Sequence, residues 1–392
     1  ADILYLTPEG APHIFMPPED AMQGSGLLRD KKGYRFDAVT PRLLEQAHVE
    51  TGGIRFPGGS RYRLLVLPND RVMTPGALEL VSRLVREGAR LLGNPPLKSP
   101  SLADRPKGDN ELQVLARQIW GGLEPPEGLN ARNWGKGTLH WGTVLEEASS
   151  RDGLYPMYSL TSGLLSATGL SEAFSSGGPP VRFAHRRDGG REIFFLSNPS
   201  AERIEFTGRF RVGAGHPELW NPMDGSVRPL PRFYRDAHLT YVPLALDPHE
   251  GFFVVFHEER AAREPDPEGR NFPVYETVAG LTGPWTVSFD PAWGGPEQIA
   301  FPGLADWTTH AERGIRYYSG KAVYTRTFPL PEDLDPETPL VLDLGRVGDL
   351  ARIELNGHSL GVAWCEPWRL PVPKGLLKEQ NRIRIEVVNS WE

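Results

Sequence analysis

The strongest constraint on the fold is a pair of strand-like segments joined by Asn356-Gly357 near the C-terminus. Asn-Gly favours a two-residue β-hairpin turn because both central positions of that turn need a positive φ. Two more strand-like segments precede the hairpin, at residues 314–328 and 342–345, and residues 382–389 alternate apolar and polar side chains as a half-buried strand does. Residues 275–392 are therefore predicted to form a β-sandwich.

Residues 1–150 show a different pattern, in which short apolar strands alternate with helices. Thr74-Pro75 is a helix-start signature, with Thr as the N-cap and Pro at the first helical position, and Gly88 marks the end of that helix. Apolar strands on either side of the helix imply a right-handed parallel crossover. The other predicted elements are strands at 2–6, 62–67 and 89–93, a short helix starting at Thr40-Pro41, a helix at 110–120, and a loop followed by a final strand within 134–142.

The part of the chain from 151 to 258 is predicted to be a small antiparallel β-sandwich, reached through a connecting segment at 151–180. Its clearest signal is Asp188-Gly189-Gly190, a turn between two strands with alternating side chains. Residues 259–274 are rich in charged side chains and read as a linker. The sequence thus predicts three domains, at residues 1–150, 151–258 and 275–392.

Charge and composition exclude several classes of partner. The net charge is −7 and the pI is about 5.9, which argues against binding to nucleic acid or to an anionic membrane surface. No run of about 18 apolar residues occurs, so no membrane span is predicted. Cys365 is the only cysteine, so neither a disulfide framework nor a cysteine-based metal site is expected.

The N-terminus lacks an initiator Met, a charged n-region and a cleavage site, and it begins inside an apparent strand. This favours either a chain trimmed at its N-terminus or a segment cut from a longer chain. The location is extracellular or periplasmic if that longer protein carries a signal peptide, and cytoplasmic otherwise. The sequence has no phosphate-binding loop, no Gly-x-Ser-x-Gly elbow and no closely spaced His pair, so no cofactor is expected. A carbohydrate-binding sandwich can hold a structural Ca²⁺ through carbonyl and Asp oxygens, and the sequence does not reveal whether this one does.

The segments, in this order, resemble the C-terminal half of glycoside hydrolase family 106 α-L-rhamnosidases. The resemblance covers most of the chain and rests on residues 34–37, 61–68, 98–102, 185–188, 217–222 and the C-terminal strands described above. It implies that a (β/α)₈ barrel with the catalytic carboxylates precedes an α/β domain. It also implies a flavodoxin-like or amidotransferase-like fold for residues 1–150, similar to the module after the barrel in family 42 β-galactosidases, and a jelly-roll, galactose-binding-like sandwich for residues 275–392. Amidotransfer would need a nucleophilic cysteine, which residues 1–150 lack.

Six residues are candidates for contact with carbohydrate, because sugar sites combine aromatic faces with planar polar groups. Trp364, Glu366, Trp368 and Arg369 lie together just after the hairpin, and strand alternation would place both tryptophans on one face. Asp37 follows an aromatic patch, and His185 lies in a strand. Four of the six have a structural alternative: Trp364 and Trp368 as core residues, Asp37 as a turn or helix-start carboxylate, and His185 as a packed strand residue.

The resemblance implies that the chain is the non-catalytic C-terminal part of an α-L-rhamnosidase-like hydrolase. It would support the missing catalytic barrel domain and contact rhamnose-containing glycans. The alternatives are a free-standing carbohydrate-binding or scaffold protein, and a complete hydrolase that uses carboxylates within these 392 residues. The missing-barrel hypothesis leads us to expect an exposed apolar patch at Ile14, Phe15, Met16 and Met22. A C-terminal sandwich that is cut short would leave an unpaired sheet edge at residues 382–390.

Overall fold

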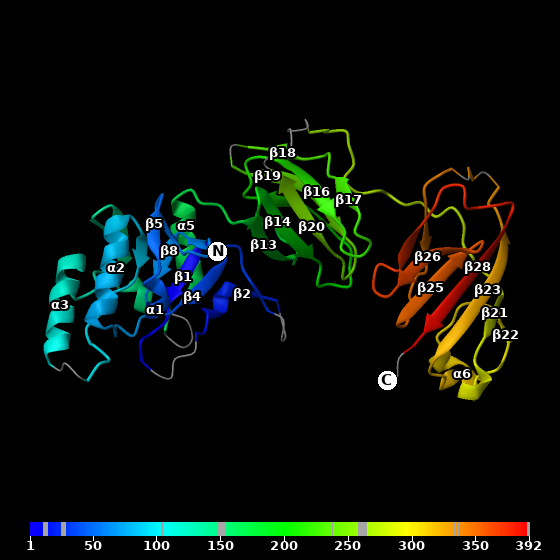
Figure 1. Ribbon diagram of the computed structural model, residues 1–392, viewed down its shortest axis with the longest axis horizontal. Helices are drawn as coiled ribbons and strands as arrows, with labels where there is room; N and C mark the ends of the chain where they lie inside the picture. The colour runs from blue at the N-terminus through cyan, green and yellow to red at the C-terminus, as the bar shows by residue number, and fades with distance from the viewer. Residues whose placement is uncertain are drawn as a thin grey trace.

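The computed structural model describes residues 1–10, 15–24, 29–102, 106–147, 154–236, 238–257, 265–332, 334–335 and 337–389. Three lobes follow one another along the long axis of the molecule (Figure 1). The first lobe covers residues 1–170 and has two apolar cores, one on each face of its sheet. The middle lobe, residues 173–272, and the third lobe, residues 281–389, have one apolar core each. The first lobe mixes helices and strands and the other two are strand-rich, so the fold is mixed α/β followed by β-sheets. No helix in the described ranges is both long and apolar enough to cross a lipid bilayer.

The first lobe is built on a six-stranded sheet in the order β10-β11-β9-β8-β1-β4. Neighbours from β11 to β4 pair in parallel, and β10 pairs with β11 in an antiparallel hairpin, which confirms the predicted parallel crossover. The main elements are β1 (Ile3–Leu6), β4 (Phe36–Val39), α1 (Pro41–Leu44), β8 (Leu64–Val66), α2 (Pro75–Glu87), β9 (Arg90–Leu92), α3 (Lys107–Trp120), β10 (Asn130–Trp134), β11 (Gly137–Trp141), α4 (Val144–Glu147) and α5 (Tyr158–Ala167). Two small sheets add β2 (Met22–Gln23) with β3 (Asp30–Lys31), and β5 (His48–Glu50), β6 (Gly53–Arg55) and β7 (Arg61–Tyr62).

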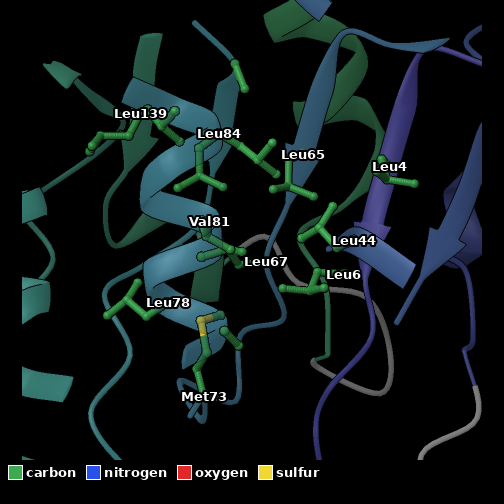
Figure 2. Close-up of a cluster of buried hydrophobic side chains, with 14 of the residues drawn as sticks. Leu4, Leu6, Leu44, Leu65, Leu67, Met73, Leu78, Val81, Leu84 and Leu139 are labelled. Atoms are coloured by element: carbon green, nitrogen blue, oxygen red, sulfur yellow. The ribbon is translucent and has the colours of Figure 1, made fainter. Parts of the chain in front are cut away.

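Helix α2 shows how local sequence sets an element of this lobe. The Thr74 hydroxyl accepts a hydrogen bond from the Ala77 N–H at 3.3 Å, and Pro75 is the first helical residue. Gly88 ends the helix with a φ of 128°, a backbone conformation that side chains with a Cβ rarely adopt. Val81 and Leu84 of the helix face Leu67 and Leu65 at the end of β8, whereas Leu78 projects from the opposite side of the helix within the same core (Figure 2). The predicted helix is therefore confirmed at both ends.

The middle lobe packs two antiparallel sheets face to face, in the orders β12-β15-β19-β18 and β13-β14-β20-β16-β17. Its core is rich in Phe, and the rings of Phe174, Phe194 and Phe256 all lie about 5 Å from that of Phe210. The hairpin predicted at Asp188 joins β13 to β14. The strands are β12 (Phe174–Ser175), β13 (Arg182–Asp188), β14 (Arg191–Ser197), β15 (Ile204–Phe210), β16 (His216–Trp220), β17 (Val227–Pro229), β18 (Tyr234–Arg235), β19 (Thr240–Leu246) and β20 (Gly251–His257).

The third lobe contains a six-stranded sheet, β22-β21-β23-β28-β25-β26, and a two-stranded sheet, β24-β27. Asn356 and Gly357 have φ values of 53° and 83° and join two paired strands, so the predicted two-residue turn is confirmed. The elements are β21 (Trp285–Ser288), β22 (Ile299–Phe301), α6 (Arg313–Arg316), β23 (Lys321–Pro329), β24 (Leu340–Asp343), β25 (Leu350–Leu355), β26 (His358–Ala363), β27 (Arg369–Val372) and β28 (Gln380–Val388).

The expectation of an unpaired edge at residues 382–390 is wrong. Strand β28 lies inside its sheet and pairs with β23 on one side and β25 on the other. Alternation along a strand reports which side chains face the core, but it does not report how many neighbours the backbone has. Residues 390–392 lie outside the described part of the chain.

The expected apolar patch near the N-terminus is wrong for Phe15 and Met22 but holds for Met16. The ring of Phe15 packs 5.6 Å from that of Tyr5 and 5.7 Å from that of Tyr155, and Met22 packs against the same core. Only Met16 is well exposed, at 57% of its surface, and Ile14 lies outside the described residues. The segment around Phe15 has neither helical nor strand periodicity, yet its side chains fill part of the core. Lack of periodicity therefore does not predict exposure.

Candidate functional site

Asp37 lies in β4, the edge strand of the first lobe's sheet. Its carboxylate accepts a hydrogen bond from the Tyr62 hydroxyl at 2.9 Å and forms an ion pair with Lys31 at 3.3 Å. Burial and this hydrogen bond together raise the pKa of Tyr62 to about 12. The structural alternative of a helix cap does not apply, because the cap of α1 is Thr40. Asp37 is thus a half-exposed carboxylate at a sheet edge, with a phenol and an ammonium as its partners.

His185 lies on β13 with its ring held between two neighbours on β14. Its Nε2 is 2.6 Å from the Glu192 carboxylate, and its ring stacks on that of Phe194 at 4.2 Å between centroids. Phe194 is fully buried, so the imidazole covers the edge of the middle lobe's core. These contacts fit the structural interpretation of His185.

The four candidates near the hairpin separate in the structure. Residues 364–368 connect β26 to β27 and are not a strand, so the expected shared face for the two tryptophans is wrong. Trp364 is 57% exposed, whereas Trp368 packs against the third lobe's core. Glu366 is half-buried in the same connection. Of these two tryptophans, Trp364 is therefore the one whose side chain is open to a ligand.

Arg369 links the third lobe to the middle lobe. Its guanidinium pairs with Asp343 at 2.9 Å and with Asp247 at 3.0 Å, and Asp247 also pairs with Arg203 at 2.6 Å. Arg369 lies 5.7 Å from the ring of Tyr275 as well. Arg369 thus has a clear structural role between lobes, which sequence reasoning could not separate from a role in binding sugar.

Glu250 supports this junction and gives a pH-dependent prediction. Its carboxylate accepts a hydrogen bond from the Asp247 N–H at 2.8 Å, and burial raises its pKa above the ordinary value of 4.5. The unfolded chain therefore loses this proton at a lower pH than the folded chain does. The contribution of Glu250 to the free energy of unfolding is highest below the unfolded pKa, and it falls as pH rises through the folded pKa. We expect Glu250→Gln to gain stability relative to wild type over the pH range that begins near the ordinary value of 4.5 and ends above the raised folded pKa.

Thermal unfolding of both proteins across that pH range measures this effect. The exposed Glu297→Gln is the matched control, and its difference from wild type should stay constant. A Glu250→Gln difference that is flat, or that falls with rising pH, contradicts the prediction.

The six predicted residues thus lie in three different lobes, and no hydrogen bond or ion pair joins any two of them. In the described ranges, no three His, Cys, Asp or Glu side chains come together as ligands for a metal ion. A hollow of about 250 Å³ lies elsewhere, between the first and middle lobes. Its lining includes Arg29, Asp30, Arg182, Phe183, Ala184 and Phe195. Sequence reasoning missed this hollow because its walls come from segments about 150 residues apart.

The comparison with protein families decides where this chain belongs. The sequence model of glycoside hydrolase family 106, described as alpha-L-rhamnosidase, matches residues 1–235. The chain belongs to family 106. The matched region includes the whole first lobe and most of the middle lobe, and therefore both walls of the hollow.

Two relatives extend the comparison for this family 106 chain. A rhamnosidase from Novosphingobium sp. PP1Y has a solved structure that is similar over 100% of this chain and 35% of its own, with a TM-score of 0.78 and 30% identity. A protein of Formosa agariphila named "Putative beta-glucuronidase" is 29% identical over 258 residues, which is 65% of this chain and 19% of that protein. The chain therefore spans about a third of one relative and about a fifth of the other.

Proposed function

We propose that this chain is the non-catalytic, C-terminal part of an α-L-rhamnosidase-like glycoside hydrolase. It would support a catalytic barrel and contact rhamnose-containing carbohydrate. The observation that carries the proposal is the match to the Novosphingobium rhamnosidase, in which the entire chain corresponds to about a third of a larger rhamnosidase. The proposal includes the finer architecture suggested by the resemblance: an amidotransferase-like first lobe, a jelly-roll third lobe, and domain boundaries within 150–180 and 258–280.

The arrangement of carboxylates supports a non-catalytic role. Glycoside hydrolysis uses two carboxyl groups on either side of the scissile bond, about 5 to 9.5 Å apart. The sequence singles out Asp37 for carbohydrate contact and not for catalysis, and its two oxygens contact Tyr62 and Lys31. Parallel strands in the described residues belong to the first lobe's open sheet, apart from one isolated bridge at Val72, and that sheet is not a barrel.

A free-standing carbohydrate-binding or scaffold protein is the second candidate. The exposed ring of Trp364 favours it, because a half-uncovered indole is a common platform for a sugar ring. For both candidate functions, Trp364 is the residue that we propose as the main contact with sugar. Contacts through Asp37, His185, Glu366, Trp368 and Arg369 stay predictions that need their own substitutions.

Hydrolysis of an aryl α-L-rhamnoside by the purified chain tests the proposal. We expect no release of the aryl group above the buffer rate, and no difference between wild type and Asp37→Asn. Turnover that copurifies with the chain and disappears when one Asp or Glu is replaced would show that the chain is itself a hydrolase.

A further inference from the structure

The outer face of the middle lobe's larger sheet carries a row of side chains in register across all five strands. Ala184 pairs with Phe195, Phe195 with Phe253, Phe253 with Trp220, and Trp220 with Val227. Residues directly opposite one another project from the same face of a sheet. The strands that carry the row, β13, β14, β20, β16 and β17, lie side by side in the middle lobe (Figure 1). Three aromatic rings therefore occupy adjacent strands at one level.

These rings are held in place by their surroundings. The centroids of the Phe195 and Phe253 rings are 5.0 Å apart. Phe195 lies over Gly251, where an added Cβ would come within 2.9 Å of the ring, so glycine lets the ring lie against the sheet. The Trp220 indole N–H donates to the Glu218 carboxylate at 3.1 Å. All three rings are half-buried, which leaves part of each open to solvent.

One end of this row opens into the hollow that contains Arg29 and Arg182. The acidic residue of the hollow, Asp30, is already engaged: it pairs with Arg35 at 2.8 Å and accepts the Phe183 N–H at 3.3 Å. Arg29 donates to the Glu19 carbonyl, and within the described part of the chain neither Arg29 nor Arg182 forms an ion pair with a carboxylate. Two guanidinium groups thus remain available for an anion, in a protein whose net charge is −7.

We propose that the aromatic row and the hollow form a binding platform for an acidic oligosaccharide. Adjacent strands are about 4.8 Å apart, so the three rings span roughly 10 Å, the length of about two sugar units. The apolar C–H faces of the sugars lie on the rings, and a carboxylate or sulfate group of the glycan lies between Arg29 and Arg182. The inference rests on the proposed function, because membership of a glycoside hydrolase family is what makes a glycan the expected occupant.

The other end of the row points to the third lobe. Met223, in the turn after Trp220, contacts Cys365 with its sulfur 3.9 Å from the thiol sulfur, and Cys365 is next to the exposed Trp364. A longer glycan chain that leaves the row at Val227 would therefore meet the indole that the sequence singled out.

Titration calorimetry with three matched probes tests the platform. The first is an oligosaccharide that alternates rhamnose and uronic acid. The second is its carboxyl-reduced, neutral form. The third is that neutral form after sulfation. We expect the acidic probes to bind more tightly than the neutral one, and the preference between the first and third identifies the carboxylate or the sulfate as the natural anion.

Substitutions test the contributions of the two arginines and of the aromatic rings to binding separately. Arg29→Gln with Arg182→Gln should weaken binding of the acidic probes by about tenfold or more and leave the neutral probe unchanged. Phe253→Ala should weaken all probes. Ala184→Glu, at an exposed position, should weaken the acidic probes without a risk to folding. Arg352→Gln, an exposed arginine in the third lobe, is the matched control and should bind as wild type does.

Three results would overturn the platform. They are no binding of any probe, folded variants that all bind like wild type, and a Phe253→Ala variant that changes self-association but not glycan binding, which would make the face a protein interface. None of these depends on rhamnoside turnover, so failure of the platform and failure of the proposed function are distinguishable.

Discussion

Replacing Phe210 by alanine is expected to destabilise the middle lobe by about 3–5 kcal/mol. Phe210 is fully buried, and three Phe rings surround it at 5.0–5.2 Å between centroids. The substitution removes the apolar surface of the ring, leaves a cavity that the two facing sheets cannot close, and breaks the ring contacts, which add stability beyond burial. Denaturant unfolding of the chain, followed through the transition of the middle lobe, measures the loss.

Phe206→Ala is the matched control for this substitution. Phe206 lies on the same strand and faces the same side of the sheet, but it is nearer the strand's start and only half-buried. Its loss should be about 1–2 kcal/mol, because less apolar surface is removed from the interior. Equal losses for the two variants would show that the four-ring cluster is not the centre of this lobe.

The second large effect is expected at Asp2, whose carboxylate pairs with Arg211 at 2.7 Å across the junction of the first and middle lobes. The Asp2 side chain is 5% exposed and that of Arg211 is 26% exposed. Asp2→Ala leaves a mostly covered guanidinium without its carboxylate. We expect a loss of about 2–3 kcal/mol, below the value for a fully buried pair because water still reaches Arg211.

An exposed pair of nearly the same length gives the contrast. Asp188 and Arg191 are 2.6 Å apart, but their side chains are 68% and 36% exposed. Asp188→Ala should therefore cost only about 0–1 kcal/mol. If both substitutions change the unfolding midpoint equally, burial is not what gives the Asp2 pair its strength.

Much of the local structure could be predicted because it is encoded by neighbouring residues. Thr74, Pro75 and Gly88 set both ends of α2, and Asn356-Gly357 sets a hairpin, since each signal acts on the backbone within a few residues. The position of β28 within its sheet could not be predicted in this way. Its pairing with β23 and β25 depends on the packing of the whole third lobe. The alternation of apolar and polar side chains is the same in a central strand and in an edge strand.

The candidate site was harder to predict for the same reason. Each of the strands with Phe195, Trp220 and Phe253 can be recognised alone, but the row exists only through the register between them. Arg369 shows the converse. Its place beside two tryptophans suggested sugar contact, and the structure gives it two aspartates from different lobes as partners. Composition identifies residue types suited to a glycan, whereas tertiary pairing decides which of them are free to bind one.

Release of free rhamnose from a rhamnose-containing oligosaccharide tests the central claim most directly. The purified chain is incubated with the oligosaccharide, and both the intact ligand and free rhamnose are quantified by chromatography. A non-catalytic, glycan-contacting part of a family 106 protein returns the oligosaccharide intact, with free rhamnose at the buffer level. Catalytic release of rhamnose that one Asp or Glu substitution abolishes would contradict the account.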